Sequence, residues 1–398
     1  MIYYCFNPAH DEALANGLPT YHPGKAARGL AADLSALPLW YAGGDACVQL
    51  GASGEVRRWY ARYASLLPGV SPLFGPSPLP PLTGMSPWGW DAALCADLRR
   101  RGVDEALLPG AGALSEVRRL SSRCEAVRML DTLRRRAAAD GWDDVLCGRS
   151  AWCTDTEAVC RNVEQHPQTV LKAPWSGSGR GLRRASGVWT DALAGWAQRV
   201  IGRQGGVAVE PWYDTVHNFA LEFETDGRGG VRYEGLSLFE TELGAYRGNR
   251  LASQERLSAF LFAGLPSGLP AYLRQLLETY LAERVARSYA GPLGVDMMVC
   301  RTARGLCVHP CVELNLRRTM GHVALSLSRR LAPDCEGWFG LDFDADSRLL
   351  AERSARRGAD GPLLHDGTHL AGGVLPLTPI DGQTHFHAYL SVRATSDQ

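Results

Sequence analysis

The chain has 398 residues, enough for two or three domains, and its 45% hydrophobic and 21% charged residues are typical of a globular protein. Its formal net charge is zero, so nothing favours a nucleic-acid or anionic-membrane partner, and its apolar runs are too short to span a membrane. The N-terminus lacks a signal-peptide pattern and the 11 cysteines form no framework, so we expect reduced thiols and a cytoplasmic location.

A small α/β domain is predicted over residues 1–115, from alternating strand and helix patterns. Residues 2–6 are typical of a first strand, and His10, Asp11 and Glu12 follow its carboxyl end. Binding sites are common at this position in α/β sheets, although any loop also carries polar residues. A second apolar run covers 37–41, the proline-rich stretch 66–90 is expected to be an irregular surface connection, and 90–101 is predicted to be helical.

The next pattern predicts one long helix over residues 115–139, closed by Gly141. Its apolar positions keep helical spacing. Arg123 and Arg128 lie off that stripe, so exposure to solvent is the first expectation for both.

A glycine- and serine-rich loop follows a short strand that ends at Lys172. Backbone amides and hydroxyls on a freely turning backbone suit a polyphosphate, and a lysine at the base of the loop adds a point charge. The order of residues fits neither of the two best-known phosphate loops, and no helix pattern follows. We therefore expect a flap between two antiparallel strands; an ordinary hairpin is the alternative. The loop residues are Ser176, Gly177, Ser178, Gly179 and Gly181.

Lysine is scarce. Of the 42 Lys and Arg residues only two are lysines, Lys25 and Lys172. The planar guanidinium of arginine does not always replace the compact ammonium of lysine. The presence of one of the two lysines at the phosphate-type loop therefore supports a function there. Lys25 lies in a Gly/Pro loop near His10 and Asp11, where a substrate-binding role and an exposed surface lysine are both open.

Two later strands bring oxygen ligands together. Glu313 and Asn315 are two residues apart on a predicted strand and so share a face, and Asp296 on the preceding strand can meet them. Two carboxylates and an amide oxygen suit magnesium, whereas solvent-facing polar alternation is the alternative. Arg317, next on the same face, could reach a phosphate. A zinc site at Cys300, Cys307 and Cys311 is disfavoured, because that segment has a strand pattern.

In order and spacing, Lys172 with its loop, Glu210 after an apolar strand, Asp296 and the Glu313-Leu-Asn315-Leu-Arg317 motif resemble the ATP-grasp superfamily over residues 115–330. The resemblance implies that Lys172 and the loop bind the triphosphate and that Asp296, Glu313 and Asn315 hold magnesium. It implies that residues 207–210, including Val209, meet adenine and that Glu210 or Asp214 lies near the ribose. Many members have another lysine before the flap; Arg123 or Arg128 would take its place here.

The implied fold class is α/β, with α+β character in the nucleotide part. A pre-grasp domain (1–115) would precede two ATP-grasp subdomains (116–205 and 206–332) and a C-terminal extension (333–398). The implied function is an ATP- and Mg-dependent ligase that activates a carboxylate as an acyl phosphate for attack by an amine, with Lys172 and Arg317 as catalytic residues. A small-molecule kinase and a non-catalytic nucleotide-binding protein are the alternatives. The expected partners are small-molecule carboxylates and amines, and an oligomer is possible.

Overall fold

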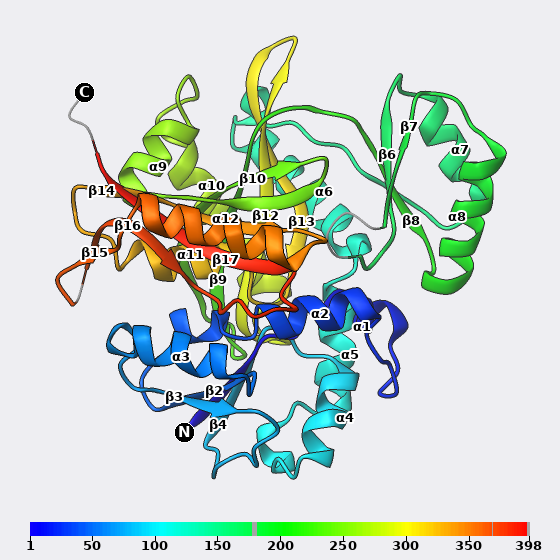
Figure 1. Cartoon of the computed structure of the whole chain (residues 1–398). Helices are drawn as coiled ribbons and strands as arrows, with labels where there is room; N and C mark the ends of the chain where they lie inside the picture. Colours follow the sequence, from blue (N-terminus) through cyan, green and yellow to red (C-terminus); the bar gives the residue numbers. More distant parts are fainter. Residues whose placement is uncertain (177–180, 368, 396–398) are drawn as a thin grey trace.

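The computed structural model describes residues 1–176, 181–367 and 369–395. The N-terminal part is a four-stranded parallel sheet in the order β3-β2-β1-β4, at the bottom of Figure 1. Its elements are β1 (Ile2–Cys5), α1 (His10–Asn16), α2 (Lys25–Asp33), β2 (Ala46–Leu50), α3 (Gly54–Tyr63), β3 (Val70–Phe74), β4 (Gly84–Pro87) and α4 (Ala92–Arg100).

One expectation for this domain is wrong. The proline-rich stretch contains the strands β3 and β4. Both lie at the edges of the sheet and have a neighbour on one side only, so Pro72 and Pro87, which lack a backbone N–H, are tolerated there. The apolar run at 37–41 lies outside the sheet. It forms a 3₁₀ turn (Leu37–Trp40) with Pro38 in its first turn, and its side chains are buried.

The predicted long helix is two helices, α5 (Ala111–Leu120) and α6 (Arg123–Ala139). The break is a helix start: the side chain of Ser122 accepts a hydrogen bond from the backbone N–H of Cys124 at 3.3 Å. The apolar periodicity continues across the break, which is why the sequence pattern missed it.

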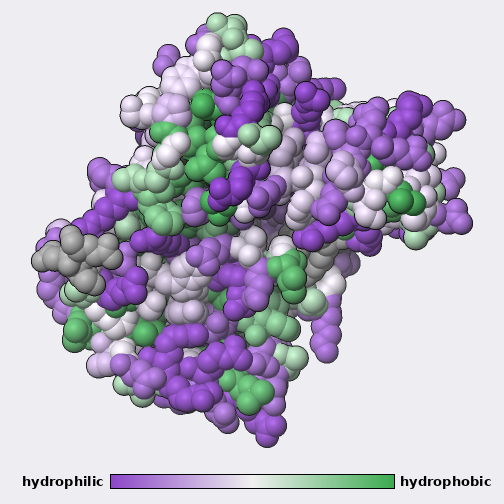
Figure 2. Space-filling view, turned by 90° about the horizontal axis from the view of Figure 1, so that it is seen from above, coloured by the Kyte–Doolittle hydropathy of each residue, from purple (hydrophilic) through white to green (hydrophobic). Residues whose placement is uncertain are grey.

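The flap subdomain has an antiparallel sheet in the order β5-β8-β6-β7. The β6–β7 pairing confirms that the glycine-rich loop joins two antiparallel strands. This subdomain lies on the right of Figure 1 and projects as a separate lobe in Figure 2. Its elements are β5 (Ala151–Cys153), α7 (Thr156–Glu164), β6 (Thr169–Lys172), β7 (Leu182–Ala185), α8 (Asp191–Gln204) and β8 (Val207–Pro211).

The largest sheet has nine strands in the order β13-β12-β9-β10-β11-β14-β17-β16-β15. The predicted C-terminal extension therefore continues this sheet through β14 to β17. The strands are β9 (Asp214–Asp226), β10 (Val231–Glu242), β11 (Ala245–Leu251), β12 (Ala290–Thr302), β13 (Gly305–Asn315), β14 (Cys335–Phe343), β15 (Leu364–His365), β16 (Leu370–Pro376) and β17 (Phe386–Ala394); the helices are α9 (Gln254–Leu261), α10 (Leu269–Arg284), α11 (Met320–Ser328) and α12 (Ser347–Asp360).

Side-chain alternation gives β9, β12 and β13 two different faces. Leu221, Val295 and Leu314 point into a core shared with α6 and α10. The residues between them point to the opposite face, where the polar side chains gather. Among the helices of the described ranges, none combines the length and hydropathy that a membrane crossing requires.

Candidate functional site

Lys172 and Glu210 form a buried ion pair beneath the loop. Lys172 is the last residue of β6, and its Nζ lies 2.6 Å from Oε2 of Glu210 on β8. The hydroxyl of Ser150 donates to Oε1 of the same carboxylate at 3.1 Å. Both charged side chains are at most 7% exposed. A buried charge requires a partner, so the pair holds the ammonium ready at the base of the loop.

Arg123 connects that loop to the large sheet. It is the first residue of α6 and is 6% exposed, so the expectation of a solvated arginine is wrong for this residue. Its guanidinium donates to the carbonyl of Ala173 and the hydroxyl of Ser176, both at 2.8 Å. It also donates to Glu313 at 3.1 Å. Arg128, in contrast, is exposed and pairs with Glu125, so Arg123 is the arginine in the site.

The oxygen ligands lie together on neighbouring strands. Asp296 on β12 stands directly opposite Glu313 on β13, and Asn315 is two residues further along β13 and lowers the pKa of Asp296. Burial, and then the charge of Glu313, raise the pKa of Asp296 to about 7. A cation between the two carboxylates would remove that repulsion, so the donor set fits magnesium. Among the described residues no group of three or more His, Cys, Asp or Glu forms a metal cluster; this set has two carboxylates and an amide.

The N-terminal domain reaches the same site through Asp11. Two nitrogens of Arg317 donate to the two carboxylate oxygens of Asp11 at 3.2 and 3.1 Å. Burial opposes ionisation of Asp11, but the Arg317 charge prevails and keeps its pKa below the usual value. The two residues are 306 positions apart in the chain. This contact places the first turn of α1 beside the end of the strand that carries Glu313.

The other predicted site residues lie in several parts of the fold. Val209 packs in the core of the flap subdomain, Asp214 is exposed, and Lys25 is exposed at the first position of α2. His10 is 1% exposed, with its ring 3.6 Å from Asp91 inside the N-terminal domain. Gly181 lies at the end of the loop, against Ser176. Gly177, Ser178 and Gly179 lie outside the described residues.

Sequence reasoning missed one polar group on this face. Glu222 on β9 is 1% exposed and stands opposite Gly294 on β12, two residues before Asp296. The available signal was a pair of glutamates two positions apart, Glu222 and Glu224, which alternate with apolar residues and so share one face of the strand.

Solved structures similar to this chain span nearly its whole length. The biotin carboxylase–β,γ-ATP complex from Campylobacter jejuni matches with a TM-score of 0.54 and 11% identity, covering 99% of this chain and 88% of that one. The N5-carboxyaminoimidazole synthetase from Staphylococcus aureus, complexed with ADP, matches with a TM-score of 0.51 and 10% identity, covering 100% and 93%. No family model and no curated protein sequence matches the chain. At this identity the likeness concerns the fold, and the chain has the ATP-grasp fold, with an N-terminal parallel α/β sheet followed by antiparallel sheets.

Proposed function

We propose that the chain is an ATP- and magnesium-dependent ligase that joins a small-molecule carboxylate to an amine or similar nucleophile. The observation that carries the proposal is the guanidinium of Arg123, which contacts both the base of the loop and Glu313. One side chain thus links the proposed phosphate-binding loop to the strands that carry the proposed magnesium ligands. A site that transfers a phosphoryl group needs both parts within reach of one nucleotide.

Each charged residue has a role in this proposal. Lys172 and Arg123 bind phosphate oxygens, with Ser176 and the glycines of the loop covering them. Asp296, Glu313 and Asn315 hold magnesium, which would neutralise phosphate charge when bound. Glu210 orients Lys172, as the 2.6 Å contact indicates. Arg317 stabilises charge on the transferring group or on the acceptor.

The reaction has two balanced steps. An oxygen of the substrate carboxylate attacks the γ-phosphorus, the bond to the β-phosphate oxygen breaks, and ADP leaves. The amine nitrogen then attacks the carbonyl carbon of the acyl phosphate, inorganic phosphate leaves, and the nitrogen loses a proton. Positioning and electrostatics supply the catalysis, so no side-chain nucleophile is required.

ADP release in the presence of magnesium, pooled amino acids and small carboxylates tests this function, with mass spectrometry of the products. A condensed carboxylate–amine product supports the ligase. A phosphorylated small molecule alone would instead establish the kinase. Nucleotide binding without turnover of any pool would establish a non-catalytic protein.

The control for this turnover assay is the variant Glu313→Gln, which keeps the shape of a proposed magnesium ligand and removes its charge. Turnover should fall in this variant while the fold is retained. Absence of ATP binding by the wild-type chain, measured by calorimetry with magnesium present, would refute the proposal altogether.

A further inference from the structure

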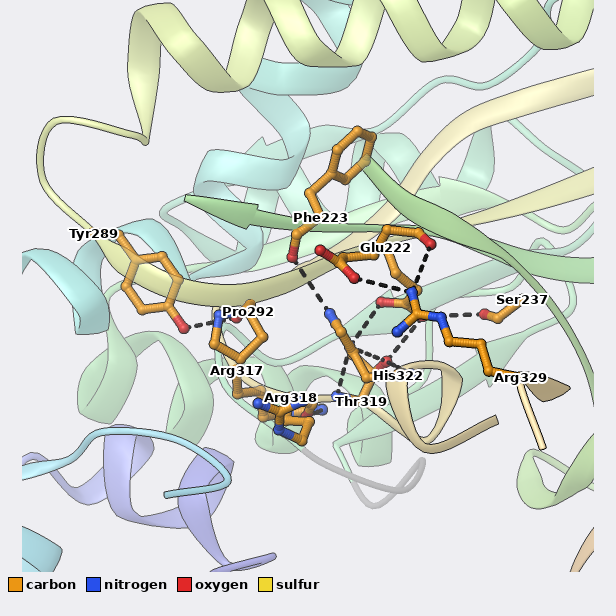
Figure 3. Close-up of polar contacts among 11 residues, drawn as sticks. Glu222, Phe223, Ser237, Tyr289, Pro292, Arg317, Arg318, Thr319, His322 and Arg329 are labelled. Carbon is orange, nitrogen blue, oxygen red and sulfur yellow. Dashed lines mark hydrogen bonds and ion pairs between the residues drawn. The ribbon is translucent and has the colours of Figure 1, made fainter. Parts of the chain in front are cut away.

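A second buried polar cluster lies beside the candidate metal strands, on the same face of the large sheet (Figure 3). It consists of Glu222 on β9, Ser237 on β10, and Thr319 and His322 at the N-terminus of α11. Each of these residues is 8% exposed or less. The site chemistry described above uses none of them.

The contacts of His322 determine where its proton lies. Its Nδ1 accepts the backbone N–H of Thr319 at 3.2 Å, as part of a capping box. Its Nε2 lies 3.3 Å from the carbonyl oxygen of Phe223, which can only accept. Nε2 must therefore carry the proton, and Nδ1 is an unprotonated acceptor, which the hydroxyl of Thr319 also approaches at 3.0 Å.

Glu222 faces the same unprotonated nitrogen. Its Oε2 is 3.1 Å from Nδ1 of His322, yet it is buried and receives no hydrogen bond from the described residues. Its Oε1 accepts from the hydroxyls of Ser237 at 3.0 Å and Thr319 at 2.9 Å. Two acceptors at this distance repel each other unless a proton lies between them.

We infer that Glu222 is a neutral carboxylic acid that donates its proton from Oε2 to Nδ1 of His322, and that it acts as a positioning residue for Arg317. The cluster fixes Thr319 to β9, and Thr319 is two residues from Arg317. A neutral carboxylic acid holds the segment from Arg317 to Thr319 in place without adding a third negative charge beside Asp296 and Glu313. This role in catalysis rests on the proposed function, whereas the protonation does not.

The neighbouring glycines support the assignment. A Cβ added to Gly294 on β12 or to Gly321 on α11 would collide with the Glu222 carboxyl oxygens. The carboxyl group therefore occupies space that side chains at these two positions would otherwise fill. Such close enclosure excludes water from the group, which favours the uncharged form.

The surrounding charges agree with a neutral pair. Burial, then the charge of Asp296, raise the pKa of Glu222 to about 8, against the lowering effects of the hydrogen bonds from Thr319 and Ser237 and of the charge of Arg317. Burial, then the charge of Arg318, lower the pKa of His322 to about 3, with Arg317 and Arg329 acting in the same direction. The charge of Glu222 in turn acts on Tyr233 on β10, whose pKa is raised. An ionised Glu222 with an imidazolium is therefore disfavoured from both sides.

Infrared spectroscopy of the intact protein tests the protonation without any substrate. The difference spectrum between wild type and Glu222→Gln at pH 7 should contain the carbonyl band of a protonated carboxylic acid. Glu224→Gln, two residues along the same strand, is the matched control and should show the loss of a carboxylate band instead. A carboxylate band lost in Glu222→Gln would overturn the inference.

Kinetics test the positioning role. In Glu222→Gln the amide nitrogen can donate to Nδ1 and the amide oxygen can accept the two hydroxyls, so kcat should stay within about threefold of wild type. Glu222→Ala should lower kcat about tenfold or more while the KM for ATP changes little, because Arg317 loses its support. Equal kcat in the alanine and glutamine variants would refute the positioning role. The protonated band in a protein that turns over no substrate would refute the proposed function and leave the protonation intact.

Discussion

The buried pair of Lys172 and Glu210 allows a quantitative test of the phosphate-binding site. Lys172→Ala removes one member of a pair whose side chains are 7% and 6% exposed. The carboxylate of Glu210 keeps only the hydroxyl of Ser150 as a partner among the described residues. Leaving one buried charge unpaired costs about 3–5 kcal/mol of unfolding free energy. Loss of a charge-assisted phosphate contact should cost about 2 kcal/mol or more of nucleotide binding.

The two effects are separable because the pair can be neutralised as a whole. In the double variant Lys172→Met with Glu210→Gln no unpaired charge remains, so most of the stability should return, as for other buried pairs replaced together. ATP affinity should stay low, because the ammonium is still absent. Urea unfolding gives the stability of each variant, and calorimetry with magnesium gives the affinity. Wild-type ATP affinity in the double variant would refute the assignment of Lys172 to the phosphates.

Three further predictions concern other residues. Glu313→Gln and Asn315→Ala should reduce turnover far more than the urea midpoint; global unfolding of either variant would show that the residue is structural. Lys25→Ala should raise the KM for the acceptor and leave that for ATP unchanged, and a change in neither would assign this exposed residue to the surface. The pKa of Glu222, raised to about 8 from an ordinary 4.5, means that the folded state retains a proton that the unfolded chain loses. Unfolding free energy should therefore fall between about pH 5 and 8, by at most about 1.4 kcal/mol per unit, and the decline should flatten in Glu222→Gln. An unchanged pH slope in that variant would contradict the assignment.

Local patterns predicted much of the fold correctly. The antiparallel hairpin on either side of the loop and the pairing of Asp296 with Glu313 both follow from strands that are close in sequence. Their period of two and their turn residues determine which side chains share a face. The resemblance to ATP-grasp proteins rested on the same residues, and the solved structures confirm that fold.

Local patterns failed where the secondary structure depends on a helix cap or on a contact distant in the chain. The helix break at Ser122 depends on one side-chain hydrogen bond within a continuous apolar periodicity. The proline-rich strands β3 and β4 exist because they lie at the edges of a sheet. Edge position is a property of the assembled sheet, and no window of sequence contains it.

The site divides in the same way. The sequence by itself determined that Lys172 ends a strand at a phosphate-type loop and that Asp296, Glu313 and Asn315 share one face. It could not decide between Arg123 and Arg128, because both lie off the apolar stripe; only the packing of α6 against the loop buries one and exposes the other. The pairing of Asp11 with Arg317 and the proton between Glu222 and His322 arise from residues about 100 to 300 positions apart. Their chemistry depends on distance and burial, which only the tertiary structure provides.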